Sequence, residues 1–317
     1  MPRPALHLAA AMLAVSIAPA HAATFLTAPR GEAIGALGSY VTTEQDTLLD
    51  VAERYDLGYT QLIAANPGID PWVPGAGRKV VLPAVYLLPD APHEGIVVNL
   101  AAQRLYYFSP KSGAVETFPI GIGVEGWATP QGVTRVVAKV KDPTWYPPPS
   151  IRAQHPELPR AIPPGPDDPL GAYALRLGWP NYLIHGTNKP DSVGRRVSHG
   201  CLHLYPADIE RLFNEVPIGT PVRVVNQQVE TRWIGGELYV AVHPSLRAAD
   251  ALEIGETVTP RLPPDLLDRV AAAAGSETSH VDWTTVRRIG LAQSGIPTPV
   301  LKRAASLRVS QGTAKTR

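Results

Sequence analysis

The chain contains a single cysteine, Cys201, within the stretch SHGCLHLYPAD (198–208). His199 and His203 lie two residues to either side of it, and a third histidine, His185, ends the apolar run NYLIHG (181–186). A thiol must lose its proton before it can attack an electrophile, and its unperturbed pKa is about 8.5, so a nearby base or positive field is needed. Four interpretations of Cys201 follow: an activated nucleophile, part of a metal site, half of an intermolecular disulfide, or an inert buried thiol.

The spacing disfavours a metal site. On a strand, His199, Cys201 and His203 would share one face, with neighbours about 6.6 Å apart, which is poor chelate geometry. One cysteine cannot form an internal disulfide. Gly200 allows a tight backbone turn beside the thiol, where N–H groups could stabilise an oxyanion. We therefore expect neither a metal nor a cofactor, and the choice between a nucleophile and an inert thiol stays open on these residues alone.

The elements that must position these residues are mostly short strands. GIVVNLAAQRLYYFSP (95–110) is typical of a β-hairpin, and PADIERLFNEV (206–216) is typical of a helix with Ile209 inward and Asp208 outward. Further strand patterns cover residues 115–124, 132–140, 181–186 and 220–226. The pattern predicts a mostly β (α+β) domain over residues 94–226.

A Pro-rich passage interrupts this domain at residues 141–178. A segment of that length without regular structure is usually functional, so we expect it to form a loop or wall near the thiol. Trp145 is the candidate within it to line a substrate site.

Residues 1–22 have the pattern of a secretory signal peptide. Arg3 supplies a positive start, an apolar run extends from about Ala5 to Ala18, and Ala20-His21-Ala22 fits a small-x-small cleavage site. The run is shorter than the about 20 residues that a membrane-spanning helix needs. We expect an exported protein with no transmembrane segment in the mature chain.

Two further regions flank the β domain. Residues 39–83 predict a strand–helix–helix–strand unit, and residues 84–94 have the composition of a linker. Residues 227–317 contain a hairpin at Gly235-Gly236, two helical patterns and a basic tail. The formal net charge of +1 gives no overall basic field, so nucleic acid is not an expected partner.

HGTNKPDSVGRRVSHGCLHLYPADIERLF (185–213) resembles the active-site signature of the YkuD-type L,D-transpeptidases, with HGT followed by SHGC. The resemblance extends over about residues 94–226 and implies a YkuD-like β-sandwich. Residues 39–83 resemble a LysM module, which binds the glycan of peptidoglycan. Together with the signal peptide, this arrangement is similar to the periplasmic ErfK/YbiS group, with residues 227–317 as a C-terminal extension.

The resemblance implies a mechanism. Cys201 attacks the diamino acid carbonyl of a tetrapeptide stem, D-alanine leaves, and the thioester passes to an amine of an outer-membrane lipoprotein or of another stem. His185 is the general base, oriented by the Gly186 carbonyl, and the N–H groups of His199, Gly200 and Cys201 form the oxyanion hole. The alternatives are water as the acceptor, which gives a carboxypeptidase or amidase, and a non-catalytic peptidoglycan-binding protein.

One position departs from the family pattern. His203 stands where the family commonly has arginine two residues after the cysteine, and histidine lacks the fixed guanidinium fork that suits a carboxylate. Arg195 and Arg196, just before Ser198, could compensate. The alternatives are a purely structural role for His203 and a solvated loop for Arg195 and Arg196. The candidate substrate-binding residues are Ser198, Arg195, Arg196, His203 and Trp145.

Overall fold

The computed structural model describes residues 23–26, 33–256 and 259–302. The expected signal peptide (1–22) and nearly all of the basic tail (303–317) lie outside the described residues. No helix within the described ranges has the length and apolarity to cross a membrane.

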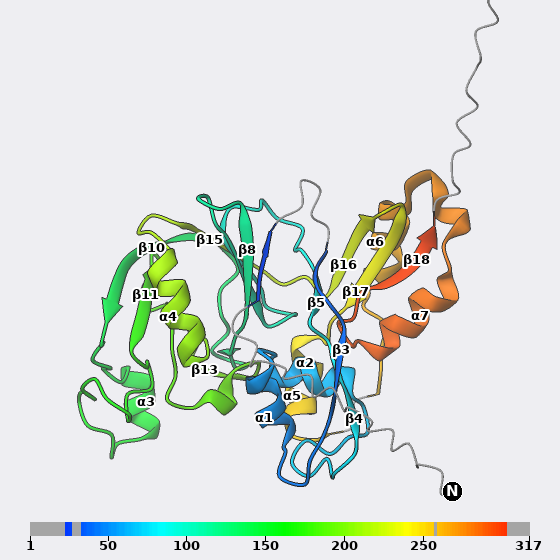
Figure 1. The fold of residues 1–317 in the computed structure, drawn as a ribbon. Coiled ribbons are helices and arrows are strands. Elements are labelled where there is room, and N and C mark those ends of the chain that lie inside the picture. The colour runs from blue at the N-terminus through cyan, green and yellow to red at the C-terminus, as the bar shows by residue number, and fades with distance from the viewer. Residues whose placement is uncertain (1–22, 27–32, 257–258, 303–317) are drawn as a thin grey trace, which may run out of the picture.

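A nine-stranded sheet forms the centre of the molecule (Figure 1). Its strands, in spatial order, are β1 (Ala23–Leu26), β8 (Ala114–Pro119), β7 (Arg104–Phe108), β6 (Gly95–Asn99), β15 (Pro221–Val225), β10 (Gly132–Lys141), β11 (Tyr173–Leu177), β12 (Leu183–His185) and β14 (Leu202–His203). The hairpin expected at 95–110 is present as the antiparallel pair β6–β7. The expected sandwich thus takes the form of one continuous curled sheet.

Strand β10 joins the two halves of this sheet. Its first residues pair with β15 and its last residues pair with β11, with a register shift between Val136 and Ala138. Such a bulge bends a strand and increases its twist, which lets one strand serve both halves. β10 ends at Lys141 and β11 begins at Tyr173, so the irregular part of the Pro-rich passage is limited to residues 142–172. This part is shorter than expected and contains the short helix α3 (Pro149–Gln154).

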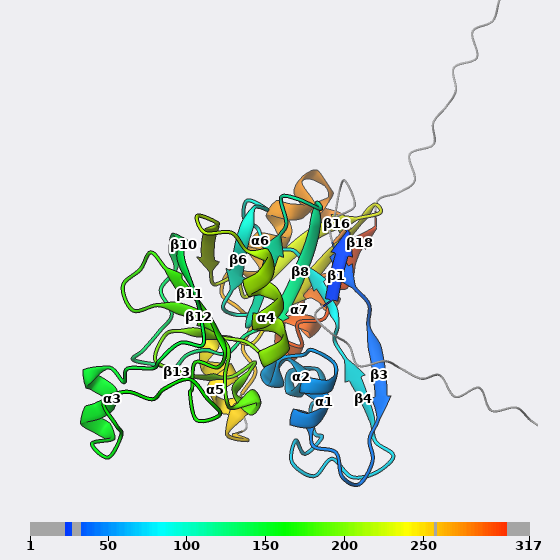
Figure 2. The same cartoon turned by 60° about the vertical axis from the view of Figure 1, so that its left-hand side comes forward.

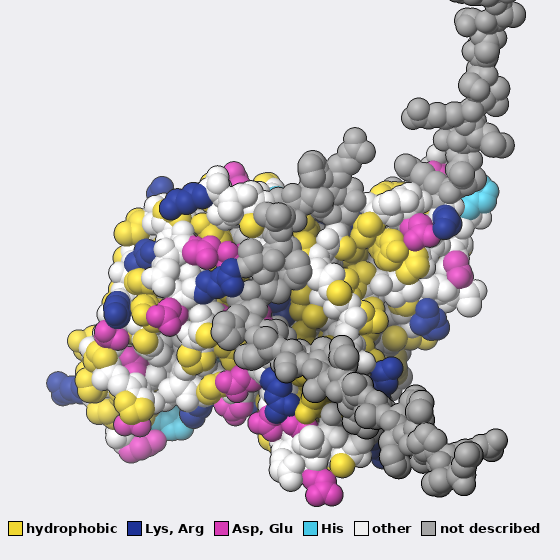
Figure 3. All heavy atoms as spheres, in the orientation of Figure 1, with side chains coloured by type: hydrophobic (Ala, Val, Ile, Leu, Met, Phe, Trp, Pro, Cys, Tyr) yellow, Lys and Arg dark blue, Asp and Glu magenta, His cyan; other side chains and the backbone are white. Residues whose placement is uncertain are grey.

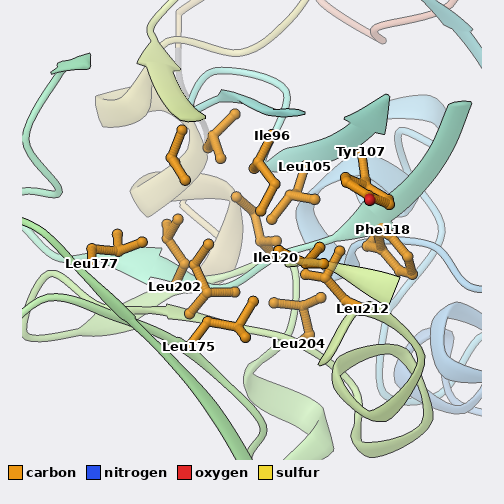
Figure 4. Packing of buried hydrophobic residues seen from close by; sticks show 14 of the residues in the cluster. Ile96, Leu105, Tyr107, Phe118, Ile120, Leu175, Leu177, Leu202, Leu204 and Leu212 are labelled. Atoms are coloured by element: carbon orange, nitrogen blue, oxygen red, sulfur yellow. The ribbon is translucent and has the colours of Figure 1, made fainter. Parts of the chain in front are cut away.

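The main core lies between the two halves of the sheet and helix α4 (Pro206–Glu215). Figure 4 shows Ile96 and Leu105 of one half opposite Leu175 and Leu202 of the other, with Leu212 of α4 among them. These residues alternate with outward positions on β11 and recur at helical spacing on α4, which is why the sequence pattern located both elements. The core holds β12 and β14 in place, and these strands carry the chemistry.

The expected strand–helix–helix–strand unit is present at residues 38–82. It consists of β3 (Gly38–Val41), α1 (Leu48–Arg54), α2 (Tyr59–Ala65) and β4 (Lys79–Leu82). Thr47 and Asp50 form a capping box that begins α1, and the unit has its own apolar core. A short strand pair flanks this unit along the chain, with β2 (Ala33–Gly35) before it and β5 (Val85–Leu87) after it, and covers the outer face of the β6–β7–β8 region. Residues 85–87 are therefore a buried strand and not part of a linker.

The C-terminal residues form a third unit with a separate core. The hairpin at Gly235-Gly236 joins β16 (Val229–Ile234) to β17 (Glu237–Val242), which also pairs with β18 (Thr298–Lys302). The expected helices are α6 (Leu266–Ala274) and α7 (Trp283–Ala292), separated by the 3-10 helix η2 (Gly275–His280). One helix was not expected, α5 (Leu246–Glu253), and it lies with α2 and β13 (Arg196–Ser198) at one end of the sheet in Figures 1 and 2.

The structure changes the expected exposure of one acidic residue on α4. Asp208 of α4 is buried and not solvent-facing, because the turn between α1 and α2 covers it and brings Asp56 beside it. On the face seen in Figure 3, acidic and basic side chains are interspersed over the left-hand part of the molecule, as the near-zero net charge suggests.

Candidate active site

His185 ends β12, and Cys201 directly precedes the neighbouring strand β14. β12 and β14 run parallel, with Ile184 opposite Leu202 and His185 opposite His203. Cys201 comes directly before β14, and its sulfur is hydrogen-bonded by the backbone of Leu183 at the start of β12. His185 is two residues further along β12, so the sheet register brings residues from two distant motifs into one site.

The His185 ring is buried and has a defined tautomer. Its Nδ1 lies 2.5 Å from the carbonyl oxygen of Gly186. Because a carbonyl oxygen only accepts, Nδ1 carries the proton and Nε2 is the basic nitrogen. Burial, followed by the adjacent His203, lowers the pKa of His185 to about 3, whereas the carbonyls of Gly186 and Leu170 act in the opposite direction. His185 is therefore a neutral imidazole over the physiological range.

The Cys201 thiol is partly buried and protonated at rest. Burial raises its pKa above the ordinary value, and the hydrogen bond from Leu183 opposes that shift. Its Sγ donates to the carbonyl oxygen of Asn181 at 3.6 Å. Asn181 has a φ of 68°, a left-handed conformation that asparagine tolerates better than most residues. With a low pKa on His185 and a high one on Cys201, the resting pair is imidazole and thiol, and proton transfer must accompany attack on a substrate.

The turn at residues 198–201 has a fixed shape. Gly200 has a φ of 102°, and a Cβ there would lie 2.7 Å from the ring of Tyr182, so the turn requires glycine. The Ser198 hydroxyl donates to the carbonyl oxygen of Cys201 at 2.6 Å and accepts the N–H of Gly200 at 3.1 Å. Thr129 donates to the carbonyl of Gly200 at 2.9 Å. Ser198 thus stabilises the turn. Its hydroxyl already accepts the Gly200 N–H, which we expected to contribute to the oxyanion hole.

His199 and His203 have different surroundings. The His199 ring contacts Trp127, with ring centroids 4.9 Å apart, and Trp127 is 38% exposed. His203 is buried against Gly121, with its Nε2 3.1 Å from the carbonyl oxygen of Ser192. Burial lowers the pKa of both histidines. His203 is therefore a neutral internal residue, and its buried position does not fit the expected contact with a substrate carboxylate.

The two arginines before Ser198 point away from the thiol and toward helix α5. Arg196 is buried and contacts Asp250, and Arg195 contacts Glu253. Trp145 is half-buried, and its backbone pairs with Ile162 across the Pro-rich loop. Of the five candidate substrate-binding residues, the structure thus brings only Ser198 directly against the Cys201 turn, and there it acts on the backbone.

Sequence reasoning missed Trp127, Thr129 and Asn181. Trp127 and Thr129 lie in GWATPQG (126–132), which the pattern identified only as a turn, and Asn181 precedes the strand that carries His185. An aromatic residue in a turn between two strands of the catalytic region was the available signal. Thr129 bonds Gly200, about 70 positions away, and Asn181 bonds Cys201 across a loop. No local sequence pattern reveals such partners.

Comparison with known proteins identifies a family for this chain. Residues 93–224 match the YkuD family, described as the L,D-transpeptidase catalytic domain. The chain is 37% identical over 308 residues to the probable L,D-transpeptidase YcfS of Escherichia coli, covering 94% of each protein. It is 40% identical to the probable L,D-transpeptidase YbiS of the same species, over 66% of this chain and 70% of that protein. The solved catalytic domain of an Enterococcus faecium L,D-transpeptidase aligns with 43% of this chain and all of that one, at 27% identity and a TM-score of 0.34.

These features define a cysteine-containing, mostly β enzyme of peptidoglycan. The chain belongs to the YkuD family of L,D-transpeptidases and has the L,D-transpeptidase activity of that family.

Proposed function

We propose that this L,D-transpeptidase acts through a thioester on Cys201, with His185 as the general base. The observation that carries the proposal is a buried histidine, its Nδ1 held by the Gly186 carbonyl, on the strand beside the one that the thiol directly precedes. With the proton on Nδ1, Nε2 is the nitrogen that accepts the thiol proton. It is the general pattern of a nucleophile, a base and a group that orients the base.

In the first half-reaction, the Cys201 sulfur attacks the carbonyl carbon between the diamino acid and the terminal D-alanine of a tetrapeptide stem. The thiol proton passes to Nε2 of His185 as the carbon–sulfur bond forms. The backbone N–H groups of Cys201 and His199 stabilise the oxyanion, because the N–H of Gly200 is already bonded to Ser198. The carbon–nitrogen bond then breaks, and the proton leaves with D-alanine.

In the second half-reaction, an amine attacks the thioester, His185 accepts its proton, and Cys201 recovers the thiol. The amine belongs to an outer-membrane lipoprotein lysine or to the side chain of another stem. Water competes for the same thioester and would make the enzyme a carboxypeptidase or amidase. Trp127 and the Pro-rich loop are the elements of the described chain that could limit access of water to it.

The remaining assignments concern the setting of this reaction. We propose a periplasmic location, on the basis of the signal-peptide pattern at 1–22 and the enzyme's peptidoglycan substrate. We propose that residues 39–83 are a LysM-like module that binds glycan. The observed strand–helix–helix–strand order and the half-exposed indole of Trp72 support a carbohydrate-binding role.

The test has two arms. Purified protein is incubated with a carbapenem and weighed, and we expect a covalent adduct that is absent from Cys201→Ala. An adduct on the Cys201→Ala protein, or none on the wild type, would contradict the thioester mechanism. Purified sacculi are then treated with the enzyme, with and without lipoprotein, and the products identify the acceptor as lipoprotein, stem or water.

A further inference from the structure

Helix α5 contacts the strand that leads into the Cys201 turn, and its Leu246 and Leu252 pack against the main core and the core of the 38–82 unit, respectively. We define the α5 junction as Asp250 and Glu253 of α5 together with Arg195 and Arg196 of the catalytic region. Figure 2 shows α5 beside β13 and below the main sheet. The helix is a full eight residues long, and the Ser245 side chain caps its N-terminus by accepting the N–H of Ala248.

The Nη1 and Nε atoms of the Arg196 guanidinium both have hydrogen-bond partners. Its side chain is 5% exposed, and its Nη1 lies 2.5 Å from Asp250 Oδ2 and 2.7 Å from the carbonyl oxygen of Leu246. Its Nε donates to the carbonyl of Gly123 on β9 (Ile122–Gly123), the short strand that pairs with β13. The cation is therefore buried between β9 and α5, where loss of its partner would leave an uncompensated charge.

Glu253 makes a different and more direct contact. Its Oε1 accepts the backbone N–H of Arg196 at 2.8 Å, and its Oε2 lies 3.5 Å from Nε of Arg195. The Glu253 side chain is only 6% exposed. The Glu253 carboxylate of α5 thus accepts the backbone N–H of the first residue of β13. Without an acceptor, that buried N–H would be unsatisfied, which costs free energy.

The module at 38–82 contacts the same loop from another direction. The N–H of Thr60 in α2 donates to the carbonyl of Gly194 at 3.0 Å, and the Thr60 hydroxyl lies 3.4 Å from Glu253 Oε1. Gly58 and Gly194 approach so closely that a Cβ on Gly194 would lie 2.2 Å from the Cα of Gly58. Residues 193–196 are therefore enclosed by α2 and α5.

A short chain of bonds connects the α5 junction to the thiol. β13 ends at Ser198, whose hydroxyl bonds both the Gly200 N–H and the Cys201 carbonyl. Val124 donates to the Ser198 carbonyl at 3.0 Å, so Ser198 itself is fixed at both its backbone and its side chain. A displacement of β13 would move the turn that carries the nucleophile.

We propose that Glu253 is a positioning residue for acyl transfer, and that helix α5 holds β13 and thereby the Cys201 turn. This inference rests on the proposed role of Cys201 as nucleophile. It gives α5, which lies outside residues 94–226, a part in the reaction through the contacts of Asp250 and Glu253 with β13. Displacement of a catalytic group by about 1 Å can lower turnover by about 100-fold, so a modest loosening has a measurable effect.

The experiment compares Glu253→Ala, Glu253→Gln and Glu256→Gln in the full-length enzyme. Glutamine retains a carbonyl oxygen that can accept the Arg196 N–H, whereas alanine does not. Glu256 lies three residues beyond Glu253 and is exposed, so it is a matched control. For Glu253→Ala we expect kcat to fall by about 10-fold to 100-fold with KM within about twofold. We expect Glu253→Gln to keep most of the activity and Glu256→Gln to match the wild type.

Two further measurements separate positioning from simple destabilisation. Because Cys201 is the single cysteine, its alkylation by iodoacetamide reports on the turn directly, and we expect faster labelling in Glu253→Ala as solvent reaches the thiol. Thermal unfolding gives the folded fraction at the assay temperature. A wild-type kcat in Glu253→Ala would overturn the proposal, as would a raised KM with unchanged kcat, unchanged alkylation of the folded protein, or a Glu253→Gln variant as impaired as Glu253→Ala. Activity in Cys201→Ala would instead refute the nucleophile assignment.

Discussion

The substitution Gly121→Ala tests the position of His203. In the structure, a Cβ built on Gly121 would lie 1.6 Å from Nε2 of His203 and 2.1 Å from its Cδ2. These two residues also exchange backbone hydrogen bonds of 2.8 Å and 3.1 Å, so their backbones cannot separate to make room. Alanine at 121 must therefore displace the imidazole.

The cost follows from two losses. Forcing a methyl group into a filled core position costs about 1–3 kcal/mol. Displacing the ring also breaks its contact with the Ser192 carbonyl, and an unsatisfied polar group costs about 1–3 kcal/mol more. We expect Gly121→Ala to lower the free energy of unfolding by about 2–6 kcal/mol, measured by urea denaturation. Turnover should fall as well, because His203 lies beside His185 in the register of β12 and β14.

A double-mutant cycle isolates the cause. His203→Ala removes the ring, so adding Gly121→Ala in that background should cost less than about 1 kcal/mol. Gly38→Ala is the control, because its Cβ would meet Leu82 only at 3.4 Å, and we expect a change within about 1 kcal/mol. An equal cost for Gly121→Ala with and without His203 would refute the placement of the imidazole over Gly121.

Three other predictions concern the site. We expect His185→Gln to lower kcat by about 100-fold to 10,000-fold while the far-UV spectrum and unfolding midpoint stay near those of the wild type; turnover within tenfold of the wild type would exclude His185 as the base. The pKa of His185 is about 3 in the folded protein and about 6.5 in the unfolded chain, so the unfolded chain binds the proton first as the pH falls. We therefore expect the free energy of unfolding to decline between these two pH values by up to about 1.4 kcal/mol per pH unit. Urea titrations should show a shallower decline in His185→Gln, and identical slopes would contradict the low pKa. Ser198→Ala removes the brace on the turn and should reduce kcat by about tenfold with little change in KM, whereas a change confined to KM would instead point to a substrate contact.

The parts of the fold that local pattern predicts were found from the sequence. The β6–β7 hairpin, helix α4 and the hairpin at Gly235-Gly236 follow from alternation, helical spacing and turn chemistry, which involve residues close together along the chain. Helix α5 and the strand β5 were missed. Both are short, and β5 lies in a Pro-containing stretch whose composition resembles a linker, although its partner β2 makes it a buried strand.

Side-chain roles were harder to predict than elements. The sequence left Arg196 open between a substrate contact and a solvated loop, and His203 open between a substrate contact and a structural role. The structure buries both, since Asp250 of α5 approaches Arg196 and Gly121 leaves a space that His203 fills. Asp208 was expected on the solvent side of its helix, and another unit of the chain covers that side.

Residue type and local spacing were enough to identify the available chemistry: one thiol, a histidine before the HGT glycine, and a glycine that permits the tight turn at the nucleophile. Those features are local, because they depend on residue type and on spacing of a few positions. The pKa values of these groups and the contacts that hold them depend on residues far away in the chain. The low pKa of His185 comes from burial and from a ring on the next strand, and the Cys201 turn is connected through β13 to a carboxylate 52 residues later in the chain. Such effects depend on which distant residues exclude water from a side chain, and chain folding alone brings those residues together.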